Sequence, residues 1–279
     1  MTLIVTSVLA FGIMVIYTCC NPETRKVWQP YSCEVFRGWG EYLKISAPAT
    51  LMLCAEFWAF ELLTVFAGIL GVMELAAQTV CITMISFLFM FPLGMQEATC
   101  ALIGNAIGAN NVPLAKRIFK LTLNITLCVN CLMVATLILL RHQVSRIFTT
   151  DEDLIEMILP LVIVTACNFF ADGLQGYLSG PIRALGLQDK AGCITLAVYW
   201  LVGLPLAALF AFKFDFSVTG LLGGFLLATL LHALSYLVLI CRANWQDIAT
   251  EAVERIRKEK EEVENAKAEK VGDDYVKQA

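Results

Sequence analysis

Two glutamates five residues apart lie inside one long apolar segment. Glu56 and Glu61 are the only charged residues of segment 45–73, which exceeds the roughly 20 apolar residues that a bilayer-spanning helix needs. A carboxyl group at this depth costs about 2.5–3.5 kcal/mol to insert, so it faces protein or water rather than lipid. Five helical residues turn through about 500°, so the two carboxyls share a broad face of the helix without stacking.

These two carboxyls have the chemistry of an exchange site for protons or cations. Loss of water disfavours the charged form of a carboxyl, and two close carboxylates repel each other, so either group is able to hold a proton near neutral pH. The alternative for each acid is a buried, protonated Glu that only hydrogen-bonds a neighbouring helix. Function is the default interpretation of an intramembrane acid, and two acids on one helix strengthen it.

Asp172 is a third acid in an apolar setting. It lies in the stretch CNFFADGLQGYLSGPIR, where Gly173, Gly176, Gly180 and Pro181 follow it. Small residues let helices approach closely, and Pro frees backbone groups that can line a cavity. We therefore expect the helix around Asp172 to bend or unwind, with Asp172 joining the same cavity; the alternative is that water reaches it from the nearby cytoplasmic end.

Trp58 is the fourth candidate, because it lies between the two glutamates with Phe57 and Phe60 on either side. Aromatic faces attract cations through their quadrupole, so these rings could stack on a flat organic cation. The alternative is that they simply pack against other helices. The candidate substrate- and proton-binding residues are thus Glu56, Glu61, Asp172 and Trp58.

The elements that must position these residues are membrane-spanning helices. The mean hydropathy is +0.73, and 58% of the residues are hydrophobic against 16% charged, which is far from the balance of a soluble domain and shows no nucleic-acid footprint. We predict an all-α membrane protein with about seven transmembrane helices. The seven apolar runs are 1–19, 45–73, 75–96, 118–140, 154–180, 191–212 and 216–241.

Basic residues in the connections orient these spans. With the N-terminus outside, nine Lys or Arg residues fall in inner loops and three in outer loops, and such residues accumulate in cytoplasmic loops. The inner ones are Arg25, Lys26, Arg37, Lys44, Lys116, Arg117, Lys120, Arg183 and Lys190; the outer ones are Arg141, Arg146 and Lys213. We predict a multi-pass protein whose C-terminal tail is cytoplasmic, in either the plasma or the vacuolar membrane.

The predicted organisation has four parts. Residues 1–19 form a transmembrane helix, 20–44 a cytoplasmic linker, 45–241 a six-helix lobe and 242–279 a charged cytoplasmic tail. The tail mixes Glu and Lys densely from about residue 246 onward, which is typical of a solvated helix held by i,i+4 pairs. A turn is predicted at the glycine-bearing loop 103–111. Because the chain opens inside a span, we expect either a fragment or a half-length protein.

Several stretches together resemble the multidrug and toxic compound extrusion (MATE) family, particularly its eukaryotic branch. They are LMLCAEFWAFE (51–61), MELAAQ (73–78), IGNAIGANNVPLAKR (103–117), IFTTDEDL (147–154), VGLP (202–205) and ANW (243–245). The resemblance implies twelve helices in two six-helix lobes, of which this chain is similar to the last helix of the first lobe and all of the second, the C-terminal lobe. It also implies an antiporter, mostly proton-coupled in eukaryotes, whose acids correspond to Glu56, Glu61 and Asp172.

The sequence therefore predicts a secondary active antiporter that exports xenobiotic organic cations or other amphiphilic small molecules in exchange for protons, with sodium less favoured. Beyond coupling protons, no cofactor or metal is expected, and the absence of HExxH, GxSxG and P-loop motifs argues against an enzyme. The expected partners are the lipid bilayer and either an N-terminal lobe or a second copy, because such lobes rock against one another around a central site. The alternative is a non-transporting membrane protein with a binding or assembly role.

Overall fold

A computed structural model describes residues 2–21, 39–255, 257 and 258. Every element in these ranges is a helix, which confirms the all-α prediction. The chain divides into two compact units, residues 1–46 and 47–279, which are described separately. Helix α1 (Thr2–Cys20) belongs to the first unit, and α3 (Trp39–Leu70) begins there and continues into the second. Most of the predicted linker, residues 22–38, lies outside the described residues.

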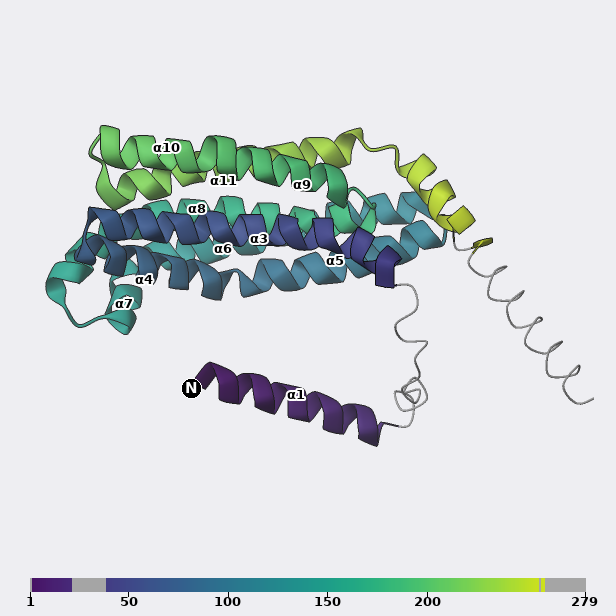
Figure 1. Ribbon diagram of the computed structural model, residues 1–279, viewed down its shortest axis with the longest axis horizontal. Helices are drawn as coiled ribbons and strands as arrows, with labels where there is room; N and C mark the ends of the chain where they lie inside the picture. Colours follow the sequence, from purple (N-terminus) through teal and green to yellow (C-terminus); the bar gives the residue numbers. More distant parts are fainter. Residues whose placement is uncertain (1, 22–38, 256, 259–279) are drawn as a thin grey trace, which may run out of the picture. The chain divides into compact units, whose positions relative to one another are not determined.

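The second unit is a helical bundle arranged around one central helix, α8 (Glu152–Ala184), which packs against four neighbours (Figure 1). These are α4 (Val72–Leu88), α5 (Met90–Gly108), α6 (Val112–Leu139) and α11 (Ser217–Arg242). A short helix, α7 (Arg141–Phe148), connects α6 to α8. The remaining segments form one further rod: α9 (Gln188–Leu196), η2 (Ala197–Gly203), α10 (Leu204–Ala208) and η3 (Leu209–Lys213).

The outer surface of the bundle is apolar, as expected for a protein solvated by lipid. Five helical stretches among the described residues are long and apolar enough to cross a membrane. Large side chains point outward along them, including Phe87 and Leu139, each 79% exposed, and Leu201, 76% exposed. A soluble domain would not leave such surface in water. The chain is therefore a multi-pass membrane protein.

Proline determines where two of these spans change course. The α4–α5 stretch is interrupted at Phe89, where the ring of Pro92 removes the hydrogen-bond donor to the carbonyl of Leu88. In the α9–η3 rod, Pro205 likewise cannot donate to the carbonyl of Leu201, and the adjoining turns widen into the π-helical segments η2 and η3. These wider turns place Tyr199 in the bundle interior.

The predicted turn at 103–111 is wrong in extent. Helix α5 continues to Gly108, and only residues 109–111 form the connection, with the Asn111 side chain capping α6 by accepting from the Leu114 backbone N–H at 3.1 Å. The local reason is that Gly104 lies within an otherwise helix-compatible run with open space around it, so the helix tolerates it.

The expected unwinding around Asp172 is wrong, whereas the expected bend stays a prediction. Helix α8 runs unbroken from Glu152 to Ala184, although it contains Pro160 and Pro181. The glycines serve close packing: a Cβ at Gly173 would lie 2.7 Å from Nδ2 of Asn130 on α6. The lack of side chains on this face lets α8 pass close to its neighbours at the centre of the bundle.

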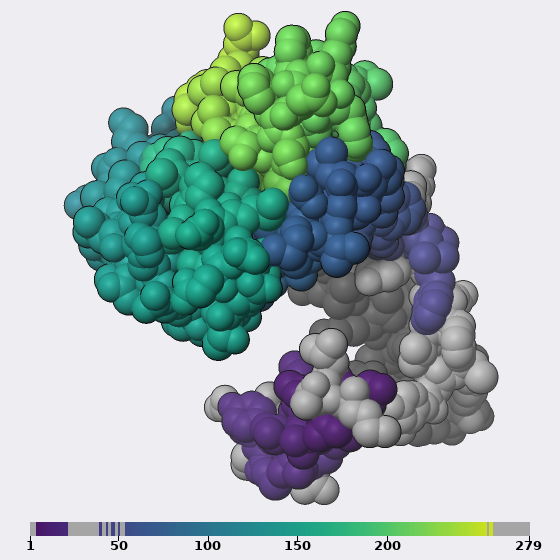
Figure 2. All heavy atoms as spheres, turned by 90° about the vertical axis from the view of Figure 1, so that its left-hand side faces the viewer, coloured from purple at the N-terminus to yellow at the C-terminus, as the bar shows by residue number. Residues whose placement is uncertain are grey.

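The helix connections gather at opposite ends of the second unit. The α3–α4 junction at Gly71, the α7 region and the η3–α11 turn share one end (Figure 1), and Figure 2 looks directly at that end. The α5–α6 and α8–α9 connections lie at the other end, with the start of the tail. This alternation is what the predicted topology requires, although the side on which the cytoplasm lies stays a prediction.

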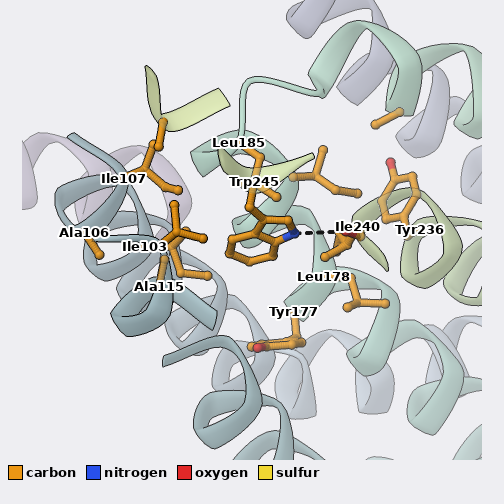
Figure 3. Close-up of a cluster of buried hydrophobic side chains, with 14 residues drawn as sticks. Ile103, Ala106, Ile107, Ala115, Tyr177, Leu178, Leu185, Tyr236, Ile240 and Trp245 are labelled. Atoms are coloured by element: carbon orange, nitrogen blue, oxygen red, sulfur yellow. Dashed lines mark hydrogen bonds between the residues drawn. The ribbon is translucent and has the colours of Figure 1, made fainter. Parts of the chain in front are cut away.

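The beginning of the tail packs onto the bundle, which corrects the prediction that the tail is entirely solvated. Residues 245–255 are helical, and Trp245 is only 5% exposed. Its indole lies among Ile103, Tyr177 and Ile240 in a buried cluster, and its Nε1–H donates to the Ile240 carbonyl at 3.2 Å (Figure 3). Apolar residues at this end therefore hold the first helical turns after α11 against the bundle. Residues 259–279 lie outside the described chain.

Replacing Trp245 with Ala should release this segment. The change removes a buried aromatic side chain, which typically costs about 3–5 kcal/mol, and local opening exposes the backbone after Arg242. We expect trypsin to cut at Arg242 at least about tenfold faster in Trp245→Ala. Gln246→Ala, which changes an exposed neighbour, should leave the cleavage rate unchanged; equal rates in the two variants would contradict the packing.

Candidate functional site

Two acids that are distant in sequence meet inside the bundle. Asp172 on α8 is 8% exposed, and Glu56 on α3 is half-buried. The two carboxyls interact electrostatically, and the Gln175 side chain, one turn after Asp172, is within hydrogen-bonding reach of Glu56. Helix α3 carries Glu56 to this point because its neighbours Ala55 and Ala59 are small and buried, so α3 lies close against the bundle.

A small cavity opens beside Asp172. Its volume is about 10 Å³, roughly the space of one water molecule. Four elements contribute to its wall: α3, α4, α8 and α11. The residues that line it are Phe60, Leu63, Gln78, Ile82, Ile85, Asn168, Asp172, Leu222, Phe225 and Thr229. The cavity therefore combines an apolar wall with one acid, Asp172, and a few other polar groups, and its size suits a water molecule.

Glu61 and Trp58 lie outside this interior. Glu61 is exposed on α3, and Trp58 is 55% exposed. Phe57 is likewise 63% exposed, whereas Phe60 packs edge-on against Phe225, with ring centroids 4.8 Å apart. The four candidates thus separate into an inner pair, Asp172 and Glu56, and an outer pair on one exposed face of α3.

A hydrogen-bonded cluster lies beside the acids between α9, η2 and α11. The Thr195 hydroxyl contacts Nε2 of His232 at 3.0 Å and the Tyr236 hydroxyl at 2.8 Å. The His232 ring meets Tyr199 edge-on with centroids 4.9 Å apart, and all four side chains are buried. Tyr199 in turn interacts electrostatically with Glu56. The cluster fixes the wall of the site, and His232 is a buried histidine bonded through one nitrogen.

Thr195 is expected to carry much of this cluster's stability. In Thr195→Val the shape is kept, but the Tyr236 hydroxyl and His232 Nε2 lose their shared partner. Unsatisfied buried polar groups typically cost about 1–3 kcal/mol. We expect that decrease in the free energy of unfolding, measured by unfolding in mixed detergent micelles. Thr136→Val removes only a bond to the backbone of its own exposed turn, so its stability should change by less than about 0.5 kcal/mol.

Sequence reasoning missed several polar residues of the site, among them Gln78, Gln175 and Tyr199. Gln78 and Gln175 carried a usable signal, because a side-chain amide inside an apolar span is expensive and normally has a purpose. Tyr199 carried none, because its position depends on the π-helical turns before Pro205. Among the described residues no group of three or more His, Cys, Asp or Glu side chains is placed to hold a metal ion.

The arrangement can hold and release a proton while keeping water scarce. Two nearby carboxyls repel each other when both are ionised, which favours keeping one proton between them, and a positive charge near the pair would favour their ionised forms. An exchange of protons for a cation needs only these groups and a way to alternate their access.

Comparisons of the sequence with known proteins identify its family. Residues 48–209, more than half of the chain, match the sequence pattern that defines the MatE family. The mouse multidrug and toxin extrusion protein 1 is 31% identical over 81% of this chain and 40% of its own length. The Arabidopsis thaliana protein DETOXIFICATION 17 is 29% identical over 86% of this chain and 51% of its own length.

Solved structures show the same fold. The eukaryotic MATE transporter AtDTX14 superimposes with a TM-score of 0.82 at 26% identity, covering 89% of this chain and 56% of that one. A MATE in the straight conformation gives a TM-score of 0.68 at 16% identity over 90% of this chain. The chain spans about 40% of the length of the first curated relatives it matches. The chain belongs to the multidrug and toxic compound extrusion (MATE) family of transporters.

Proposed function

We propose that this chain is the substrate- and proton-binding part of a secondary antiporter that exports organic cations in exchange for protons. The observation that carries the proposal is that Asp172 and Glu56, two acids on different helices, interact electrostatically in a bundle whose outer surface is apolar. Protonation of such a pair changes its charge, and a change of charge supplies the differential affinity that any ligand-driven switch requires. The comparisons support a transport role, since the mouse relative named above is a multidrug and toxin extrusion protein and AtDTX14 is a MATE transporter.

Within this proposal the exposed face of α3 is where substrate arrives. Glu61 supplies a negative charge near Trp58 and Phe57, whose rings are free to stack on a planar cation. The positive charge of the cation would favour the ionised form of the inner pair, which would then release a proton. A second lobe, or a second copy of this chain, would close over this face, because alternating access needs two bodies that move against each other.

The experiment is efflux of ethidium, a fluorescent organic cation, from proteoliposomes that hold the chain under an imposed pH gradient. We expect gradient-driven flux in the wild type and its loss in Glu61→Gln. Glu156→Gln is the matched control, because Glu156 is an exposed acid in the first turns of α8, far along the helix from Asp172. Flux that ignores the pH gradient would contradict proton coupling, and ethidium binding without any flux would favour a non-transporting binding protein.

A second set of reconstitutions tests whether transport needs a second lobe. The first six-helix lobe of a relative, co-reconstituted with this chain, should raise the flux if two lobes are needed. Two copies of the chain acting together would instead give flux that rises with the square of the protein-to-lipid ratio. Unchanged flux in both arms would contradict the need for a second body.

A further inference from the structure

Gln78 is a buried amide that faces the cavity with no hydrogen-bond partner. It lies on α4, is 0% exposed and lines the same cavity as Asp172. Within the described residues neither its Oε1 nor its Nε2 makes a hydrogen bond. Leaving a buried donor or acceptor unpaired is costly, so native proteins rarely do so without a reason. The amide is thus available to a group that enters or changes charge in the cavity.

An ionised Asp172 needs a hydrogen-bond donor, and the other polar side chains of the cavity already donate to backbone carbonyls. Nδ2 of Asn168 donates to the Leu222 carbonyl at 3.0 Å and to that of Val164 at 3.2 Å. The Thr229 hydroxyl donates to the Phe225 carbonyl at 3.0 Å. No described side chain donates a hydrogen bond of good geometry to the Asp172 carboxyl, and Nε2 of Gln78 is the remaining uncommitted donor of the lining.

The size of the cavity sets how the two groups can meet. A volume of about 10 Å³ holds about one water molecule. Gln78 and Asp172 both line this cavity, so one water bound in it is placed to bridge polar groups of the wall. The long Gln78 side chain can also approach the Asp172 carboxyl by a rotamer change.

We propose that Gln78 is a positioning residue for Asp172: its Nε2–H donates to the carboxylate when the proton leaves, and so stabilises the ionised, cation-ready form. This inference rests on the proposed function, because it assumes that Asp172 gains and loses a proton. Hydrogen bonds to charged groups are roughly twice as strong as hydrogen bonds between neutral groups. One amide donor is therefore enough to shift the protonation equilibrium of a carboxyl that has no other donor.

Other titratable groups lie on the elements packed around Asp172. Glu56 on α3 and Tyr199 on η2 interact with it electrostatically, and the buried Tyr199 hydroxyl also lacks a hydrogen-bond partner among the described residues. Further groups on the packed elements include Cys81 on α4, Glu97 on α5, Tyr177 and Arg183 on α8, and His232 and Tyr236 on α11. Glu97 and Arg183 pair with each other at 2.6 Å near the end of the bundle, so they do not satisfy Asp172. None of these supplies the amide donor that Gln78 offers.

The test is a pH titration of the carboxyl C=O infrared band in the full chain in lipid bilayers, with the Asp172 contribution identified by its loss in Asp172→Asn. Gln78→Met keeps the volume and removes the amide. We expect the midpoint of the Asp172 band to rise by about one pH unit, a tenfold change in the protonation equilibrium, because the anion has lost its donor. Gln78→Asn keeps an amide, so its midpoint should stay close to the wild-type value.

The control is Thr165→Val, which removes a buried unpaired hydroxyl from α8 outside the cavity lining; its midpoint should match the wild type. An Asp172 midpoint that is the same in Gln78→Met as in the wild type would overturn the role of Gln78 while leaving proton exchange at Asp172 intact. A wild type with no Asp172-dependent band at any pH would overturn proton exchange at Asp172, and the role of Gln78 with it.

Discussion

We expect proton-driven efflux of an organic cation to fall by about 10- to 100-fold in Asp172→Asn and in Glu56→Gln, and the double variant to be no worse than either single one. A 10- to 100-fold change corresponds to a typical coupling free energy between two bound ligands, about 1–3 kcal/mol. Each amide removes one exchangeable proton and one negative charge from the interacting pair. Because the two carboxyls act as one titrating system, removing the second adds little.

The measurement is the initial rate of ethidium efflux from proteoliposomes at a fixed pH gradient, with protein amount matched. Glu156→Gln controls for the loss of an acid from α8. Additive losses in the double variant would contradict a coupled pair and indicate two independent sites.

Stability responds most strongly to close helix contacts, and adjacent glycines on α11 give opposite results. A Cβ at Gly224 would lie 2.6 Å from the Cα and N atoms of Ala207 on α10, whereas a Cβ at Gly223 would meet nothing within 4 Å. We expect Gly224→Ala to lower the free energy of unfolding by about 1–3 kcal/mol, because backbone must move to admit the methyl group.

Gly223→Ala is the matched control and should leave stability unchanged or raise it by up to about 1 kcal/mol, since Ala favours the helix. Unfolding of both variants by a denaturing detergent in mixed micelles gives the comparison. Equal destabilisation of the two would show that α10 and α11 are not in backbone contact, and would contradict the packing of the α9–η3 rod.

The spans were predictable because lipid imposes a simple rule on sequence. Long apolar runs with charges between them predict the helices, and all seven runs coincide with helical segments of the structure. Their ends were less predictable. The 75–96 run belongs to a helical stretch that extends to Gly108. An apolar run indicates which residues lie in lipid, but it does not predict how far a helix continues beyond the lipid.

The inner acids were predictable from cost, whereas their partners were not. Asp172 and Glu56 stand out because an acid within an apolar span is rare and expensive. Sequence alone could not separate Glu56 from Glu61, since that depends on which face of α3 turns inward; the structure turns Glu56 toward Asp172 and leaves Glu61 exposed. The role of Tyr199 depends on π-helical turns, which no local pattern predicts.

The most direct test of proton-for-cation exchange is proton release on cation binding. Ethidium is added to the purified chain in a weakly buffered bilayer suspension, and released protons and bound cation are counted together. The account predicts about one proton released for each cation bound near neutral pH, and no release in Asp172→Asn. Cation binding with no release of protons from the wild type, at any pH between about 5 and 8, would contradict it.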